Sequence, residues 1–434
     1  MNAPAIKGWC PGVLSPMESG DGLIVRLKIT GGIVPVALAR EIAEWSRRWG
    51  NGQIDLTART NLQLRGLTAE NLPKLQEAIA TAGLLDADPD GEAVRNVIAS
   101  PLAGLDPGAV LDIRPIVASL EARLTGDKRL HALPAKFCFV VDDGGRLGLG
   151  DVRADIRFEA LATSDGPIFT IFFDGGEDRR VGSCKPADVA EVAYLMSSIF
   201  LVRRERSDGK IARVRDLVAE DGIRALAGGE RHGPKSRAVR AAEGEASSRL
   251  GVHAPRKSTP GAVRETPAYI GIGLPFGRIA AGDLADLANR AASHGAGELR
   301  LTPWRAILIP LPSAEAALSL AATLPTDVFV LDPSDPRRRV AACAGAPACA
   351  RATTDVRGDA THLAASVPEN AMLHVSGCAK GCAHPRAAAV TLVGWDGRYD
   401  LVRDGVPWDV PALAGMSAAE AARHVRDIFE GKAA

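Results

Sequence analysis

The alternation of apolar and polar residues predicts the same strand and helix twice along the chain. In two segments every second residue is apolar, as in a half-buried strand: Leu23, Val25, Leu27 and Ile29, and later Ile270, Ile272 and Leu274. An amphipathic helix is predicted after each strand, with an apolar face formed by Leu38, Ile42, Trp45 and Trp49 in the first copy and by Leu284, Leu287 and Ala291 in the second. Pro35 suits the first turn of the first helix, and Asp283 is the expected N-cap of the second.

A longer similarity supports this internal repeat. The segment NGQIDLTARTNLQLRGL (51–67) resembles AGELRLTPWRAILIPLP (296–312), which begins 245 residues later. LPAKFCFVVDDGGRLGL (133–149) corresponds more loosely to GCAKGCAHPRAAAVTLVGWDGRYDL (377–401), and both predict a loop, a strand and a hairpin turn at Asp-Gly. Each half is therefore expected to be a small α/β unit followed by a larger one.

The fold class expected from this repeat is α+β, with four units in tandem. Residues 225–262 are rich in Ala, Gly, Arg and Ser and contain few large apolar side chains, which is typical of a linker. The expected boundaries are 8–85 and 90–224 for the units of the first half, and 263–328 and 335–434 for those of the second.

Composition excludes several classes of protein. The 434 residues are 46% hydrophobic and 24% charged, as in a globular protein, and Lys plus Arg equals Asp plus Glu at 52 each. This balance indicates no nucleic-acid or membrane-surface partner, and aromatic residues at 4% are too few for a base-stacking platform. No apolar run approaches about 18 residues, and the first residues show no secretory signal, so we expect a cytoplasmic protein without a membrane span.

Four of the seven cysteines form a pattern that indicates a metal centre. Cys343 and Cys349 are separated by five residues, and Cys378 and Cys382 by three. A disulfide is unfavourable in a reducing compartment, and the first spacing is wide for structural zinc, whose ligands usually lie about two to four residues apart. Small residues around the cysteines would let backbone N–H groups approach sulfur, and Gly381 can adopt a positive φ, so an iron–sulfur cluster is favoured.

Together, the repeat and the cysteine spacing resemble the sulfite and nitrite reductase family. Proteins of this family are a tandem repeat of a ferredoxin-like half-domain and a larger α/β domain. The resemblance implies that the two small units are ferredoxin-like half-domains, and that Cys343, Cys349, Cys378 and Cys382 hold a [4Fe-4S] cluster in the second larger unit. In family members with siroheme, the ligand that matches Cys382 also bridges to the tetrapyrrole iron.

Three further motifs resemble those that place cations in the active site of the family. Arg59 lies in LTART, Arg95 in VRNV and Lys136 in LPAKFC. Cations aimed at carboxylates or a small oxyanion form strong hydrogen bonds in a partly dry cleft, so these three are predicted to bind substrate. The last motif departs from the family pattern, because Ala135 and Cys138 stand where the family has a basic residue and a lysine. That lysine binds and protonates the anion in sulfite and nitrite reductases, so its loss weakens the case for a reductase.

The N-terminal segment KGWCPGVLSPMESGDGLIVRLK (7–28) resembles the opening of precorrin-3B synthases, the cobalamin-pathway branch of the family. The matching residues are Cys10, Pro11, Pro16, Met17, Gly20, Asp21, Gly22, Leu23, Val25 and Arg26. The resemblance implies a monooxygenase that hydroxylates precorrin-3A at C20 and closes a γ-lactone. It also implies the cluster, a mononuclear non-haem iron, dioxygen and a reductant, with Arg59, Arg95 and Lys136 facing the carboxylates of the tetrapyrrole.

Several points stay open at the level of the sequence. No histidine pair with a carboxylate marks a ligand set for the mononuclear iron, and His131, His374 and His384 are interpreted as structural. Cys10 and Cys138 lie on segments expected to face the cleft, and Cys10 is interpreted as a buried packing residue. No G-x-G-x-x-G motif follows a strand, so we expect an external electron donor. A siroheme-dependent sulfite or nitrite reductase, and a non-catalytic iron–sulfur protein that binds a tetrapyrrole, are the alternatives.

Overall fold

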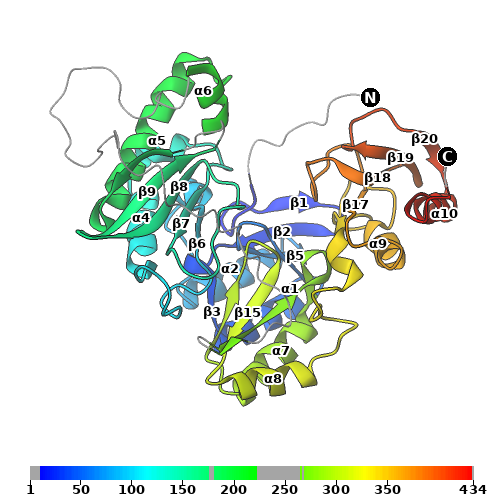
Figure 1. Cartoon of the computed structure of the whole chain (residues 1–434), viewed down its shortest axis with the longest axis horizontal. Helices are drawn as coiled ribbons and strands as arrows, with labels where there is room; N and C mark the ends of the chain where they lie inside the picture. Colours follow the sequence, from blue (N-terminus) through cyan, green and yellow to red (C-terminus); the bar gives the residue numbers. More distant parts are fainter. Residues whose placement is uncertain (1–9, 175–179, 222–263, 266–267, 433–434) are drawn as a thin grey trace.

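Four five-stranded sheets organise residues 10–174, 180–221, 264–265 and 268–432, which are the residues that the computed structural model describes. Two of the sheets form a central unit, and each of the other two forms a larger unit beside it (Figure 1). The predicted linker, 225–262, lies outside the described residues. Among the described residues, no helix is long and apolar enough to cross a membrane.

The central unit contains two sheets that exchange one strand with each other. The order of the first sheet is β1 (Met17–Ser19), β2 (Gly22–Leu27), β5 (Leu62–Leu67), β4 (Gln53–Leu56) and β13 (Arg278–Ala280). The order of the second is β11 (Arg264–Glu265), β12 (Ala268–Gly273), β15 (Ala306–Pro310), β14 (Glu298–Leu301) and β3 (Ile33–Pro35). In the first sheet β13 of the second half pairs Ile279 with Ile54, and in the second sheet β3 of the first half pairs Val34 with Leu299. The two half-domains are therefore joined as one body.

Two glycines at matching positions of the repeat permit this exchange. Gly32 precedes β3 and Gly277 precedes β13, and their φ angles are positive, 68° and 74°. A Cβ on Gly32 would lie 3.0 Å from the carbonyl oxygen of Leu301, and a Cβ on Gly277 would lie 2.9 Å from that of Leu56. Only glycine combines this backbone conformation with such a close approach. Each exchanged strand is therefore preceded by a residue without a side chain, which lets the two halves come into contact.

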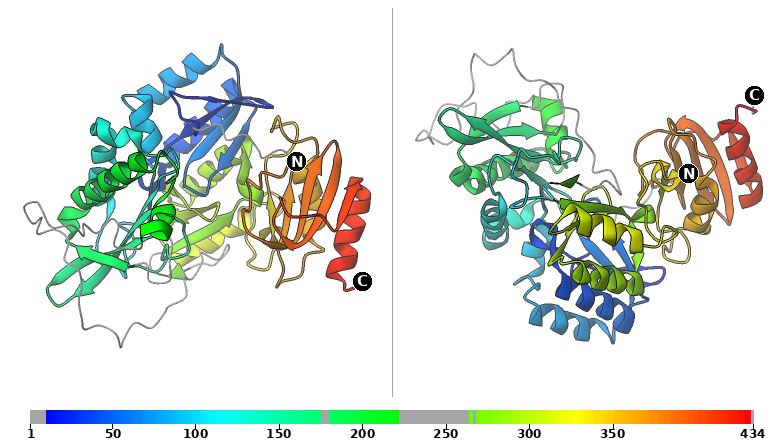
Figure 2. Two further views of the ribbon diagram at one scale, coloured as in Figure 1. Left: turned by 90° about the horizontal axis from the view of Figure 1, so that it is seen from above. Right: turned by 60° about the horizontal axis from the view of Figure 1, so that its bottom comes forward.

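Helices on one side of the central unit bury the apolar residues whose spacing predicted them (Figure 2). These helices are α1 (Val36–Trp49), α2 (Leu72–Thr81), α7 (Ala281–Ser293) and α8 (Ala314–Thr323). Ile42 and Leu287 are fully buried and belong to a single core that runs through both half-domains. The predicted cap is wrong: Ala280 is the N-cap of α7, and Asp283 lies inside the first turn, where its charge complements the helix dipole.

The two larger units share one sheet topology. The first sheet has the order β10 (Arg180–Cys184), β9 (Gly166–Phe173), β8 (Ile156–Thr163), β7 (Phe139–Asp142) and β6 (Val97–Ala99). The second has the order β20 (Leu413–Met416), β19 (Arg398–Gly405), β18 (Ala388–Trp395), β17 (Leu373–Ser376) and β16 (Val340–Ala342). In both, the first three strands along the chain are parallel and the following pairs are antiparallel. The helices are α3 (Pro89–Val94), α4 (Arg114–Gly126), α5 (Val189–Arg206) and α6 (Val214–Asp221) in the first unit, and α9 (Val356–Ala364) and α10 (Ala418–Phe429) in the second.

This topology corrects the expected correspondence between the larger units. The Asp-Gly pair at 143–144 follows β7, which runs parallel to β8, so it is not a hairpin turn. The pair at 396–397 does form the predicted hairpin between β18 and β19. The loop after β17, which holds Cys378 and Cys382, therefore matches the loop after β7, residues 143–155. The same dipeptide misled the sequence comparison because it begins a hairpin in one copy and a crossover in the other.

One buried carboxylate connects the half-domains to the second larger unit. Asp55 on β4 is 8% exposed and lies opposite Arg278 of the exchanged strand β13. It accepts hydrogen bonds from Arg278 at 2.7 and 3.0 Å and from Arg357 of α9 at 3.1 Å, and Arg65 lies 3.4 Å away. Burial alone would raise the pKa of Asp55, but Arg357, Arg278 and Arg65 outweigh it and lower the pKa to about 2.

Replacing Asp55 by Asn should destabilise the protein by about 3–5 kcal/mol at neutral pH, because buried guanidinium groups lose their counter-charge. The lowered pKa means that this stabilisation is present above about pH 4 and is lost as the pH falls toward about 2. Urea unfolding at pH 7 and near pH 3 should show the difference between the two proteins shrinking in acid. Asp112→Asn, at an exposed pair with Arg114, is the control and should cost less than about 1 kcal/mol. Equal costs for the two substitutions would contradict the role given to Asp55.

Candidate functional site

A cleft opens where the central unit meets both larger units. Its main cavity has a volume of about 670 Å³. Side chains from all of these units line it, including Cys10, Arg26, Asp55, Arg59, Lys136, Arg153, Phe276, Trp304, Arg305, Cys343, Arg357, Cys382 and Arg386. The cavity therefore exists only in the assembled fold, because no single unit supplies its whole wall.

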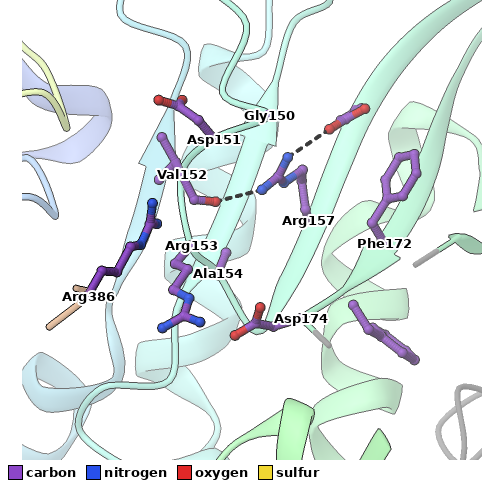
Figure 3. A pocket seen from close by; sticks show the side chains of 11 residues that line it. Gly150, Asp151, Val152, Arg153, Ala154, Arg157, Phe172, Asp174 and Arg386 are labelled. Atoms are coloured by element: carbon purple, nitrogen blue, oxygen red, sulfur yellow. Dashed lines mark hydrogen bonds and ion pairs between the residues drawn. The ribbon is translucent and has the colours of Figure 1, made fainter. Parts of the chain in front are cut away.

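A second cavity of about 710 Å³ adjoins the first (Figure 3). The two cavities share Asp151, Val152, Arg153 and Arg386 in their walls. Arg153 and Arg386 come from the matching loops of the two larger units and lie next to each other in Figure 3. Arg157 is held at 2.6 Å from the Val152 carbonyl, so it stabilises the loop on this side of the cavity. The two cavities are therefore neighbours along this shared part of the wall.

The four predicted cluster cysteines gather at the edge of this cleft. Cys343 follows β16 and Cys378 follows β17, and these parallel neighbours end on the same side of their sheet. The amide of Gly377 donates to the sulfur of Cys343 at 3.2 Å. Burial raises the pKa of Cys343, and the neighbouring thiols of Cys349 and Cys378 add to the rise, as expected for sulfurs that lie close together. Gly381 has the predicted positive φ, 62°. Four neighbouring thiols, one of which accepts a hydrogen bond from a backbone amide, are a donor set that fits an iron–sulfur cluster.

The N-terminal motif packs against the loop between the first two of these cysteines. The hydroxyl of Ser19 donates to the Ala348 carbonyl at 2.6 Å, and Arg65 donates to the same carbonyl. Arg65 is itself held by Asp21 at 2.9 Å. A Cβ on Gly20 would overlap the carbonyl of Pro347, so here the two backbones are in direct contact. The Ser-Gly-Asp-Gly stretch thus braces the cysteine loop.

Cys10 lines the main cavity, and its interpretation as a packing residue is wrong. It is half-buried and lies beside Arg26, Arg59 and Lys136. Burial would raise the pKa of Cys10, but Arg26 and Arg59, with a smaller effect of Lys136, outweigh burial and lower it. The cations therefore favour a thiolate at this position.

Positive side chains outnumber negative ones in the cleft. Six lining cations form no ion pair with a carboxylate anywhere in the described part of the chain: Arg26, Arg59, Lys136, Arg153, Arg305 and Arg386. Burial lowers the pKa of Arg26 and of Arg305, and the Nε atom of Arg26 has no hydrogen-bond partner among the described residues. Asp55, the buried carboxylate at this wall, is already bound by three arginines. Uncompensated cations in a shared cleft favour the binding of an anion with several charges.

Of the three cations predicted to bind substrate, Arg59 and Lys136 line the cleft and Arg95 does not. The guanidinium of Arg95 binds Asp86 at 2.7 Å and Glu121 at 3.4 Å, and it donates to the Lys28 carbonyl at 3.1 Å. Burial would lower the pKa of Arg95, but the two carboxylates outweigh it and raise the pKa. Its hydrogen-bonding capacity is used within the fold, so its position does not support the prediction.

Cys138 also lies away from the cleft, contrary to the expectation from its motif. The residue is 1% exposed, and burial raises the pKa of its thiol to about 11. Its backbone amide donates to Asp155, and its sulfur lies 3.6 Å from the Phe139 carbonyl oxygen. Cys138 is therefore a neutral core residue, while Lys136, two positions earlier, faces the cavity.

Sequence reasoning did not nominate Arg305, Arg357 or Arg386. A signal for Arg305 was available in the internal repeat. Arg305 lies 245 residues after Thr60, so it belongs to the turn that corresponds to the one with Arg59. Arg305 and Thr60 both have a positive φ, 58° and 56°, so the turns after β14 and β4 have the same local conformation. Arg357 and Arg386 carried no such signal, since their roles depend on contacts between units far apart in the sequence.

Family models match three segments of the chain. The nitrite/sulfite reductase ferredoxin-like half domain matches residues 15–82 and 263–324, and the nitrite and sulphite reductase 4Fe-4S domain matches residues 90–228. The clustered cysteines lie outside these matches, in the second larger unit, which has the same sheet topology as the matched first one. The expected fold class is confirmed.

Relatives match nearly the whole chain. A precorrin-3B synthase of a Sinorhizobium species is 34% identical over 410 residues, which are 94% of this chain and 84% of the relative. A ferredoxin–nitrite reductase of Synechococcus elongatus is 29% identical over 403 residues, which are 87% and 77% of the two chains. The solved structure of the Mycobacterium tuberculosis NirA protein has the same fold, with a TM-score of 0.72 and 20% identity over 95% of this chain and 81% of that one. This chain belongs to the nitrite and sulfite reductase family.

Proposed function

We propose that the protein is a precorrin-3B synthase, a monooxygenase that uses dioxygen and a reductant to hydroxylate precorrin-3A at C20 and close a γ-lactone in aerobic cobalamin biosynthesis. The observation that carries this proposal is the set of unpaired cations in a cleft that adjoins the clustered cysteines. The 34% identity to a precorrin-3B synthase supports it. The N-terminal motif contacts the cysteine loop and so helps to hold that loop in place beside the cleft.

The cleft suits a large ring with several carboxylates. Its main cavity alone falls within the range of about 300–1,000 Å³ that is usual for small-molecule sites, and the second cavity extends it. Phe276 and Trp304 offer apolar surface for the ring system. Arg59 and Lys136 would bind carboxylates at the edge of the ring, and Arg26 lowers the pKa of the Cys10 thiol beside them.

Electrons would enter the cleft from the side of the clustered cysteines. Cys343 and Cys382 line the main cavity, so a [4Fe-4S] cluster held there would border the bound substrate. Held by these cysteines, such a cluster would supply electrons one at a time from an external donor. Arg357 donates to the Cys343 carbonyl at 3.2 Å and to Asp55, and so keeps this edge of the cleft fixed to the central unit.

A siroheme-dependent reductase is the second candidate, favoured by the 29% identity to a ferredoxin–nitrite reductase. Siroheme would then occupy the cleft in place of the substrate. Cys138 argues against this candidate, because it replaces the anion-binding lysine with a buried, neutral thiol. A non-catalytic protein that binds a tetrapyrrole would use the same cations, and turnover separates it from both enzymes.

Replacing Cys378 or Cys382 by Ser should remove a thiolate that the cluster requires. Iron and acid-labile sulfide should fall together, as measured by metal analysis and visible absorption. The activity should also be lost. Cys184→Ser, in β10 of the other larger unit, is the matched control and should retain the cluster. Variants at 378 and 382 with full iron and sulfide would show that these thiols are not ligands.

Replacing Arg59 or Lys136 by Ala should weaken precorrin-3A binding about 30-fold, or about 2 kcal/mol, because a carboxylate loses its charged partner. Arg95→Ala is the control: it should leave binding nearly unchanged and lower the melting temperature, since it breaks two buried ion pairs. Anaerobic titration with precorrin-3A and thermal unfolding measure the two effects. The assignment fails if all three variants bind equally well, or if Arg95→Ala is the weakest binder.

Turnover under isotopically labelled dioxygen distinguishes the oxygenase from the reductase. Incubation of the holoprotein with precorrin-3A and a reductant should give a product that carries labelled oxygen, detected by mass spectrometry. The same preparation should reduce neither sulfite nor nitrite, and its spectrum should lack siroheme bands. Rapid nitrite or sulfite reduction without label in a corrinoid precursor would overturn the proposed function, and so would a holoprotein that binds precorrin-3A without converting it.

A further inference from the structure

A buried histidine without partners lies behind the wall of the cleft. His374 is on β17 and is 0% exposed, and neither of its ring nitrogens has a hydrogen-bond partner in the described part of the chain. Thr391, its neighbour on β18, donates its hydroxyl to the Gly405 carbonyl instead. A buried polar group without a partner is costly and uncommon, and a missing ion is one of its ordinary explanations.

A second histidine faces the first. The ring centroids of His374 and His384 are 5.7 Å apart, with an angle of 71° between the ring planes. Metal–nitrogen bonds of about 2.1 Å place the centroids of two imidazoles on one ion about 4.5–6 Å apart, so the observed separation fits a shared ligand.

The pair lies beside the cleft and is separate from the four thiols. Ala383 and Pro385, on either side of His384 in the sequence, both line the main cavity. Arg305 and Arg386 are the charged groups near His384, and their positive charge would disfavour a bare cation. An anionic ligand from the cavity side would offset this effect, and a carboxylate of the substrate or a hydroxide ion has the required charge.

The other histidine singled out in the sequence differs from this pair. His131 has ordinary partners, since its Nε2 atom lies 3.0 Å from the Thr125 carbonyl oxygen and its Nδ1 atom lies 3.8 Å from Asp88. The carboxylate of Asp88 caps α3 by accepting from the amides of Asp90 and Gly91. That cluster is explained by the fold, whereas the pair of His374 and His384 is not.

We infer that His374 and His384 bind one divalent transition-metal ion, separate from the iron–sulfur cluster. Imidazole nitrogens suit Fe²⁺ and its neighbours in the first row, and two imidazoles leave the remaining positions to water, hydroxide or a carboxylate of the substrate. The identification of the ion as iron rests on the proposed function, while the binding of a metal by these two side chains does not. This inference differs from the interpretation of both histidines as structural.

The iron-to-sulfide ratio of the holoprotein tests this inference without turnover. A [4Fe-4S] cluster alone has equal iron and sulfide, so the wild type, after anaerobic addition of Fe²⁺ and desalting, should hold about one further iron per chain. Mössbauer spectra of protein enriched in the iron isotope should show this atom as a separate high-spin ferrous doublet. His384→Ala and His374→Ala should lose the extra iron and the doublet and keep the cluster. His362→Ala, an exposed residue of α9 in the same unit, is the control and should match the wild type.

The possible outcomes distinguish this inference from the proposed function. Because His374 is buried, its variant could fold poorly, and His384→Ala, at a half-buried loop position, then decides the matter. Retention of the extra iron in His384→Ala, or a wild type with equal iron and sulfide after Fe²⁺ addition, would overturn the inference. If the extra iron depends on both histidines but precorrin-3A is not oxygenated, the metal site stands and the proposed function fails.

Discussion

Asp55 is the carboxylate on which the arrangement of the cleft depends. Three guanidinium groups converge on it: Arg65 from its own half-domain, Arg278 from the exchanged strand of the other, and Arg357 from the unit with the clustered cysteines. The attraction of these arginines outweighs the burial of the carboxylate, so it stays ionised in the interior. Without this charge, three cations would repel each other at the place where the two half-domains and the second larger unit meet.

The two larger units show how one architecture can serve two tasks. Their sheets are alike, and matching loops from both reach the cleft. The loop of the second unit carries thiols, whereas the loop of the first carries Arg153 and presents charge without sulfur. Under the proposed function, one copy would serve redox chemistry and the other substrate binding, while the strands that support each loop keep the same arrangement.

Local features of the fold could be predicted from the sequence, and contacts between units could not. The strand at Leu23 and the helix around Ile42 follow from residue periodicity, and Gly381 can adopt its positive φ because glycine has no Cβ. The strand exchange has no local signature, since β3 and β13 look like ordinary strand ends until their partners are known. The Asp-Gly pair at 143–144 was misread for the same reason, because whether a turn leads to a hairpin or a crossover depends on the strand that follows.

For the candidate site, too, the sequence predicted some positions correctly and could not predict the contacts that each side chain makes. Motif positions placed Arg59 and Lys136 in the cleft, but Arg95, with an equally good motif, lies between Asp86 and Glu121. A motif specifies a residue type at a position, and the ion pairs that the side chain finds there decide whether it remains available to a ligand. The histidine pair is a local case, since His374 and His384 lie in one short segment on either side of Cys378 and Cys382, but only the fold shows that the loop after β17 brings the two rings together.

The exchanged strands also affect the order in which the chain can fold during its synthesis. β3 leaves the ribosome before the entire first larger unit, and its partner β14 follows only after that unit. In the same interval β4 also lacks its partner β13. The edges of β3 and β4, and part of an apolar helical layer, therefore have no native partner. A message cut short anywhere before β14 would therefore not encode a smaller working unit. It would encode a fragment with open sheet edges, which is the kind of species that chaperones bind and proteases remove.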